Sequence, residues 1–218
     1  MADYTEAKYL ARAEEVAYTS EITAVIVEPR TTDLDVRYRL PPQEYKGRLL
    51  IWRGVTPDLS SDPILDMDLD PNQERVKVET TATNFVKGAY FVAITVGNEL
   101  TTMAATVVLF NGQPMNQSGS FIFPTAKVSN YVSTVYGNPI NNTGRTNSDW
   151  AIIYEGTELQ QGELVAYSQA QLDESSGVIN VRFEPGSLES GKYYNVCLSI
   201  GPHEKTISAA YVFKYLLV

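Results

Sequence analysis

The 218-residue sequence contains one cysteine and one histidine, and it lacks long apolar runs. The lone cysteine, Cys197, excludes an intramolecular disulfide, so packing alone must stabilise the fold. The lone histidine, His203, leaves little from which to build a Ser-His-Asp or Cys-His catalytic arrangement. No glycine-rich phosphate loop and no Cys/His zinc spacing occurs, so we expect no cofactor and no enzymatic activity.

Basic residues are also scarce relative to acidic ones. The 17 lysines and arginines are outnumbered by 26 aspartates and glutamates, which gives a formal net charge of −9. No basic run interrupts this excess. A nucleic-acid backbone requires clustered cations, so a nucleic-acid partner is not expected. No stretch is apolar enough to span a bilayer, and we expect no membrane insertion.

The segment Met1–Lys8 lacks the apolar core of a secretory signal peptide. This favours folding in a reducing cytoplasm, in keeping with the single cysteine. Export by a signal-less route, or release together with a particle, remains open.

The sequence repeats itself at a long interval. Residues 87–94 (KGAYFVAI) reappear as residues 190–197 (SGKYYNVC), and the two glycines, Gly88 and Gly191, lie 103 positions apart (191 − 88). Residues 49–54 (LLIWRG) reappear as 151–156 (AIIYEG) at nearly the same offset. Two blocks at one period of this length predict a duplicated small domain.

Most of the chain has the alternation of apolar and polar residues that is typical of half-buried strands. The exception is the N-terminal segment, where Asp3 and Glu6 form a capping-box pattern that predicts a short helix. We expect an all-β protein of two tandem seven-stranded sandwiches preceded by that helix. The expected divisions are a helical segment 1–20, a first sandwich 21–110, a linker 111–119 and a second sandwich 120–218.

Short motifs in both halves resemble immunoglobulin-like and fibronectin type III-like domains. In residues 188–194 (LESGKYY) a turn glycine precedes an aromatic pair, as at the start of the sixth strand of those folds, and residues 85–90 (FVKGAY) repeat the pattern. Trp52 lies on the third strand, where such domains often carry a large core aromatic. The resemblance implies tandem immunoglobulin-like sandwiches without the antibody-type disulfide.

An acidic series is the most metal-like feature. Asp66, Asp68 and Asp70 share one face of a strand, and carboxylate oxygens suit calcium. Like charges along a strand are also how an edge strand resists pairing with other chains. A calcium site and a solvated edge are both open, and the second half does not duplicate the series.

The duplication acts as an internal control, because features found in only one half are candidates for function. The second half has a long loop, 137–148, where the first half has a short one, and its polar composition suits hydrogen bonding to a ligand. A tolerated insertion is the alternative. The candidate binding residues in this loop are Asn138, Asn141, Asn142, Thr143, Arg145 and Asn147.

Taken together, these features predict a structural or interaction protein that binds a protein partner or associates with itself. Acidic, disulfide-free tandem modules of this type resemble accessory components of bacterial or phage assemblies. The alternative is a carbohydrate- or ligand-binding module that uses loop 137–148. A count of 14 tyrosines fits either interpretation.

Overall fold

The computed structural model describes residues 15–27, 33–41, 46–70, 73–78, 88–139, 142–159, 162–201 and 206–216. Every regular element within these ranges is a β-strand, and all strand pairs are antiparallel. The described residues form no helix of the length and apolarity that crossing a bilayer requires.

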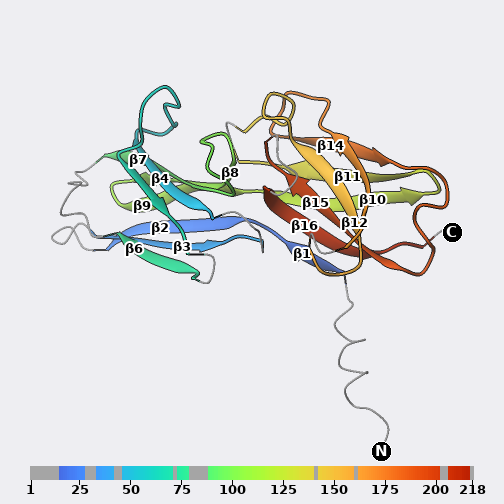
Figure 1. Cartoon of the computed structure of the whole chain (residues 1–218). Helices are drawn as coiled ribbons and strands as arrows, with labels where there is room; N and C mark the ends of the chain where they lie inside the picture. Colours follow the sequence, from blue (N-terminus) through green and yellow to red (C-terminus); the bar gives the residue numbers. More distant parts are fainter. Residues whose placement is uncertain are drawn as a thin grey trace, which may run out of the picture.

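The first half of the chain forms two facing sheets, shown on the left of Figure 1. A three-stranded sheet has the order β2–β3–β6, and a five-stranded sheet has the order β5–β4–β7–β8–β9. The strands are β2 (Glu21–Val27), β3 (Asp33–Arg39), β4 (Arg48–Arg53), β5 (Leu65–Asp68), β6 (Arg75–Val78), β7 (Ala89–Thr95), β8 (Met103–Phe110) and β9 (Gln113–Gly119).

The second half repeats this arrangement. A three-stranded sheet has the order β10–β11–β14, and a five-stranded sheet has the order β1–β16–β15–β12–β13. The strands are β1 (Val16–Tyr18), β10 (Phe121–Val128), β11 (Tyr131–Gly137), β12 (Trp150–Glu155), β13 (Leu164–Gln169), β14 (Ser176–Arg182), β15 (Tyr193–Ser199) and β16 (Ile207–Lys214).

Each pair of sheets encloses its own apolar core, because alternate side chains of every strand point inward. In the first half, Leu34, Ile51 and Val92 are fully buried between the sheets. In the second half, Val132 and Val196 take the corresponding places. This is an immunoglobulin-like, fibronectin type III-like β-sandwich fold, as the sequence motifs predicted.

The expected tyrosine anchor is also present. The backbone N–H of Glu189 donates a 2.8 Å hydrogen bond to the hydroxyl of Tyr194. A tyrosine at the start of the sixth strand that bonds to the backbone just upstream is the tyrosine corner of immunoglobulin-like domains. Trp52 is buried too, but it packs with Phe91 on the outer face of its sheet and not between the sheets.

The sequence alignment of the two halves is wrong by one residue in this region. Tyr90 pairs with Arg53, and Tyr194 pairs with Glu155, so Tyr194 and not Tyr193 corresponds to Tyr90. One extra residue after Gly191 causes the shift. Because strand side chains alternate, a one-residue slip exchanges inner and outer faces.

The predicted N-terminal helix is not supported. Val16–Tyr18 form strand β1, which pairs with β16 of the second half, and residues 1–14 lie outside the described residues. The open edge of β16 offers backbone hydrogen bonds that a short, imperfectly amphipathic helix could not replace. In Figure 1, β1 lies beneath β16 although it belongs to the start of the chain.

The predicted linker is also wrong. Residues 113–119 form β9, which pairs along β8 through the tight turn at Asn111 and Gly112. Its polar sequence reflects an edge strand whose side chains are mostly exposed. Strands β1 and β9 therefore add one strand to the seven expected in each sandwich.

The two added strands pair in one common register. Thr106 lies opposite Ser118 in the first half, and Ala210 lies opposite Tyr18 in the second. Each added strand then continues into the first strand of the other half, so the two connections cross side by side at the junction. There the N–H of Ser20 donates to the carbonyl oxygen of Ser120 over 3.2 Å.

The junction has an approximate two-fold relation. The hydroxyl of Ser20 donates to the carbonyl of Ser208 on β16, and the hydroxyl of Ser120 donates to the carbonyl of Ala104 on β8. Both serines are buried. Contacts in which equivalent residues exchange roles are the mark of a two-fold interface.

The hairpins before β8 and β16 obey the same relation. A Cβ at Gly97 would lie 3.0 Å from Cγ2 of Thr206, and a Cβ at Gly201 would lie 3.2 Å from Cγ2 of Thr102. Because each glycine lacks a Cβ, the threonine side chain of the opposite half can pack closely against it. The apolar cluster of Val96, Ala104 and Ile200 fills the space beneath.

Candidate functional site: a polar groove and the junction loop

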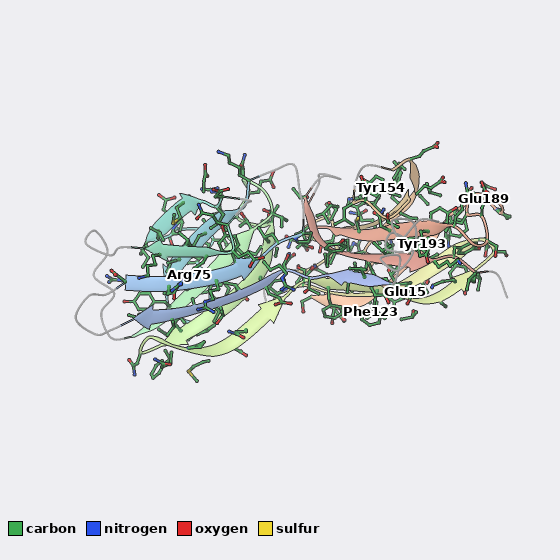
Figure 2. The ribbon with its side chains drawn as sticks, turned by 90° about the horizontal axis from the view of Figure 1, so that it is seen from below. Glu15, Arg75, Phe123, Tyr154, Glu189 and Tyr193 are labelled. Carbon is green, nitrogen blue, oxygen red and sulfur yellow. The ribbon has the colours of Figure 1, made fainter. Side chains whose placement is uncertain are left out.

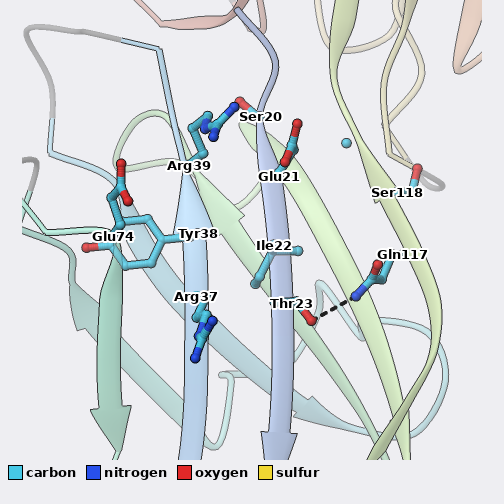
Figure 3. A pocket seen from close by; sticks show the side chains of 11 residues that line it. Ser20, Glu21, Ile22, Thr23, Arg37, Tyr38, Arg39, Glu74, Gln117 and Ser118 are labelled. Atoms are coloured by element: carbon cyan, nitrogen blue, oxygen red, sulfur yellow. Dashed lines mark hydrogen bonds between the residues drawn. The ribbon is translucent and has the colours of Figure 1, made fainter.

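A groove of about 610 Å³ runs along β2 in the first half. Figure 3 shows β2 as its floor, with β3 on one side and β9 on the other. The hydroxyl of Thr23 accepts a 2.9 Å hydrogen bond from the side-chain amide of Gln117 across the floor. The lining residues are Ser20, Glu21, Ile22, Thr23, Arg37, Tyr38, Arg39, Glu74, Gln117, Ser118 and Gly119.

The charged residues of the groove are two arginines, Arg37 and Arg39, and two glutamates, Glu21 and Glu74, with Glu21 opposite Arg39 in the strand pair. Arg37 and Arg39 are exposed, because they alternate along β3 with buried Val36 and Tyr38. Within the described residues the structure shows no ion pair to either guanidinium. Both can therefore bind a carboxylate or phosphate in the paired geometry that arginine favours.

Neighbouring Asp35 is ion-paired with Arg75, although the charge of Arg37 also contributes to lowering its pKa. Nε and Nη2 of Arg75 donate to its two carboxylate oxygens over 2.7 and 2.6 Å. The hydrogen bonds from Arg75 hold the pKa of Asp35 below its ordinary value. Figure 2 labels Arg75 in the first half. No basic run in the sequence revealed this surface, because Arg37 and Arg39 are separated along β3 by Tyr38.

The same place in the second half is apolar. Strand register makes Phe121 the counterpart of Glu21, and Phe123 the counterpart of Thr23. The two phenylalanine rings stack with centroids 5.9 Å apart. A Cβ at Gly137 would lie 2.4 Å from the ring of Phe121, so this ring lies directly against the glycine. Aromatic rings thus occupy the surface that is an open polar groove in the first half.

Across the sheet the contrast continues. In the first half Thr23, Arg37 and Arg75 form one cross-strand row. The equivalent row in the second half is Phe123, Val135 and Val178, and the phenylalanine and Val178 are exposed by 40% and 53%.

The predicted binding loop of the second half turns inward at the junction. The side-chain amide of Asn142 donates a 3.0 Å hydrogen bond to the carbonyl of Met103 in the first half, and Asn142 is buried. Asn138 is buried beside it and donates to Asp149. These two side chains are therefore not available to a ligand in solvent.

The other predicted loop residues are divided. Asn147 donates to the side-chain oxygen of Asn142 and supports the docked conformation. Thr143 is half-buried and Arg145 is exposed, and Asn141 lies outside the described residues. The polar composition noted in the sequence serves the junction at Asn138, Asn142 and Asn147.

Asp149 is the buried carboxyl that holds this loop. It accepts hydrogen bonds from the side chain of Asn138 and, over 3.2 Å, from the N–H of Gly201. Burial raises its pKa from 3.8 to about 7 despite these two donors. The same burial, with the charge of Asp149 adding to it, raises the pKa of Tyr136. By strand register, Gly47 is the counterpart of Asp149 in the first half.

Asp66 and Asp68 of the acidic series lie on β5, an edge strand of its sheet, and Asp70 follows the end of that strand. Arg48 forms an ion pair with Asp66 and donates from Nε over 2.9 Å, while Asp68 and Asp70 are exposed. Among the described residues no group of three His, Cys, Asp or Glu side chains could hold a metal ion. The structure places the series on a charged, exposed sheet edge and does not bring the three carboxylates together.

Cys197 is fully buried, and burial raises the pKa of its thiol. Its counterpart by register is Ala93, and not Ile94 as the sequence alignment suggested. It therefore packs in an outer-face cluster with Ile152 and Tyr154. His203 lies outside the described residues.

Comparisons with known proteins do not identify the chain. No family model matches it, and no curated protein matches it. Among solved structures, it is similar to the BSP domain of a biofilm associated protein, with 11% identity and a TM-score of 0.29. That match covers 83% of this chain, which spans only 27% of the other.

A second similar structure is the selenomethionine-substituted chicken interferon gamma receptor alpha chain. It shows 8% identity and a TM-score of 0.30, and the match covers 91% of this chain and 98% of the other. Scores this low carry no argument about function. The fold assignment rests on the sheets, cores and tyrosine corner described above.

Proposed function

We propose that this chain is a non-enzymatic interaction protein made of two immunoglobulin-like domains, with a boundary near Ser120. The two separate cores and the repeated strand order support this division. The junction contacts support a fixed relative orientation, which suits a structural role. An accessory component of a bacterial or phage assembly is the setting that its acidic, disulfide-free composition favours.

The groove along β2 is the proposed binding site, and an extended acidic segment of a partner protein is the proposed ligand. The observation that carries this proposal is the contrast between the halves: a groove lined by hydrogen-bonding groups, two arginines and two glutamates in one, and stacked phenylalanines in the other. Arg37 and Arg39 would hold carboxylates, and Gln117 and Ser118 would bind the peptide backbone.

An array of extended peptides, acidic and neutral, probed with the full chain tests the proposal. We expect acidic peptides to bind in a salt-sensitive manner and the double variant Arg37→Gln/Arg39→Gln to lose about tenfold in affinity. Thr23→Phe, which copies Phe123 of the second half, should close the groove and weaken binding equally.

Arg182→Gln is the matched control, because Arg182 is an exposed arginine on a strand of the second half. It should bind like the unmodified protein. Equal loss in this control would indicate general charge attraction. Unchanged binding by Thr23→Phe would refute the groove as the site.

A carbohydrate-binding role has one specific observation in its favour. Trp150 lies two residues after the end of loop 137–148, and its ring packs edge-on against that of Tyr167 with the centroids 5.4 Å apart. Tyr167 is 58% exposed, and an exposed aromatic face can stack on a sugar ring. A glycan array probed with the unmodified chain and with Tyr167→Ala distinguishes this role, since only a sugar bound there would be lost.

A further inference from the structure

Strands β1 and β9 close the two sandwiches in the same way but are attached differently. β9 follows β8 through the two-residue turn at Asn111 and Gly112, so its pairing is local. β1 has no such connection to β16, because nearly the whole chain separates them. Only the chain around Ser20 links β1 to β2 of the first half.

β1 also has fewer pairing contacts with its neighbouring strand than β9 has. Three residue pairs join it to β16, whereas six join β9 to β8. Of its three residues, Val16 and Ala17 are exposed. Beyond the strand, Glu15 accepts hydrogen bonds from the hydroxyl of Tyr211 over 2.9 Å and from Nζ of Lys127 over 3.2 Å. Figure 2 places Glu15 beside the β10 region of the second half.

We propose that β1 is an exchangeable strand, and that β1 of one copy of this chain pairs with β16 of a second copy in a reciprocal dimer. Every contact of residues 15–18 with β16 and β10 would be formed again between copies, with the hinge between Ser20 and Glu21. The hydrogen bond from Ser20 to Ser208 would move with the strand, whereas those from Ser20 to Ser120 and from Thr19 to Glu21 would break.

The occupant is a second copy because the edge of β16 is already complementary to this strand. The register of the β1–β16 pair matches that of β9 on β8, which shows that both edges are built for such a strand. Exchange of an identical element adds no new interface, and its extent then depends on protein concentration.

Disulfide trapping in the full chain tests the exchange. Val16 and Val212 are opposite each other across the strand pair, so Val16→Cys and Val212→Cys are made in separate chains. Cys197→Ala removes the buried thiol from both, and alanine is the residue at the equivalent position of the first half. The two variants are mixed, incubated at high concentration and oxidised.

We expect a disulfide-linked dimer with one chain of each kind, at a yield that increases with concentration. Val16→Cys mixed with Asn116→Cys is the mismatched control, because Asn116 is exposed on β9 and faces β8. The matched pair should give severalfold more dimer than this control. A chain with both Val16→Cys and Val212→Cys should close within itself when dilute, which shows that the pair can form a bond.

The proposal is overturned if the double variant closes within itself while the mixture gives no more dimer than the mismatched control. Failure of the double variant to close would equally overturn it, since the strand pairing itself would then be wrong. The groove variants do not enter this experiment, so its outcome is independent of the proposed ligand.

Discussion

The two halves of this protein share a fold and differ in the residues on their exposed surfaces. Both have the same strand order, the same added edge strand and equivalent junction contacts. The outer surface of the small sheet is polar and carries Arg37 in the first half, whereas Phe123 and Val178 make it apolar in the second. Buried positions determine the fold, so exposed positions were free to diverge toward separate binding roles.

The largest expected effect comes from breaking the junction that both halves share. A Cβ at Gly119 would lie 1.9 Å from the backbone oxygen of Ser20, so Gly119→Ala forces the two crossing connections apart. We expect the free energy of unfolding in urea to fall by about 4 kcal/mol. Gln113→Ala, at an exposed position of the same strand, should change it little, and a small effect at Gly119 would refute the close crossing.

The second-largest expected effect is a pH dependence of stability that arises from Asp149 in the second half. The pKa of Asp149 is raised to about 7, so its contribution to stability is fully present below pH 3.8 and is lost as the pH rises through 7. We expect unfolding free energy to decrease by roughly 3 kcal/mol from pH 4 to pH 8. Asp149→Asn should remove most of this slope.

Asp173→Asn is the control for that experiment. The hydrogen bond from Thr146 lowers the pKa of Asp173, so its contribution is lost as the pH falls and not as it rises. The slope between pH 4 and pH 8 should therefore survive in this variant. If Asp149→Asn left the slope unchanged, another group would be responsible for it.

A smaller effect tests the two-fold relation directly. Ser20→Ala and Ser120→Ala each remove one buried hydroxyl, which donates to a carbonyl of β16 and of β8 respectively. Each should lower the unfolding free energy by about 1 kcal/mol, because one buried hydrogen bond is lost, although the carbonyl of Ala104 still accepts from the N–H of Ser120. Clearly unequal losses in thermal or urea unfolding would show that the two crossings are not equivalent.

The smallest effect comes from exchanging the surfaces. Thr23→Phe and Phe123→Thr each place the residue of one half on the other, at positions exposed to solvent. We expect either change to alter unfolding free energy by about 0.5 kcal/mol or less. A large loss in Phe123→Thr would mean that the stacked rings stabilise the sandwich and do not merely cover its surface.

Local patterns in the sequence were enough to find most strands. The strands that begin at Phe121, Tyr131, Trp150, Tyr193 and Ile207 all carry such patterns, because alternation and turn residues are local signals. The motif around Tyr194 was sufficient for the fold type. The one-residue error beside it arose because an inserted residue changes the face without changing the composition.

The predicted linker and binding loop show where local patterns fail. Residues 113–119 are polar because β9 is exposed, and an exposed edge strand has the composition of a loop. The identity of an asparagine does not reveal whether its amide contacts solvent, a ligand or a buried carbonyl. The sequence therefore could not show that Asn138 and Asn142 are buried at the junction. The groove was missed because Arg37 and Gln117 meet only after distant strands are brought together.

The sequence by itself determined that this is a duplicated all-β protein, since periodicity, turns and repeated motifs are properties of short segments. The tertiary structure alone decided that β1 closes the second sandwich, that Asp149 is buried at the junction and that one half carries a groove. These features depend on contacts between segments far apart in the chain. Such contacts form only where backbone groups and apolar surfaces from separate strands satisfy each other at once.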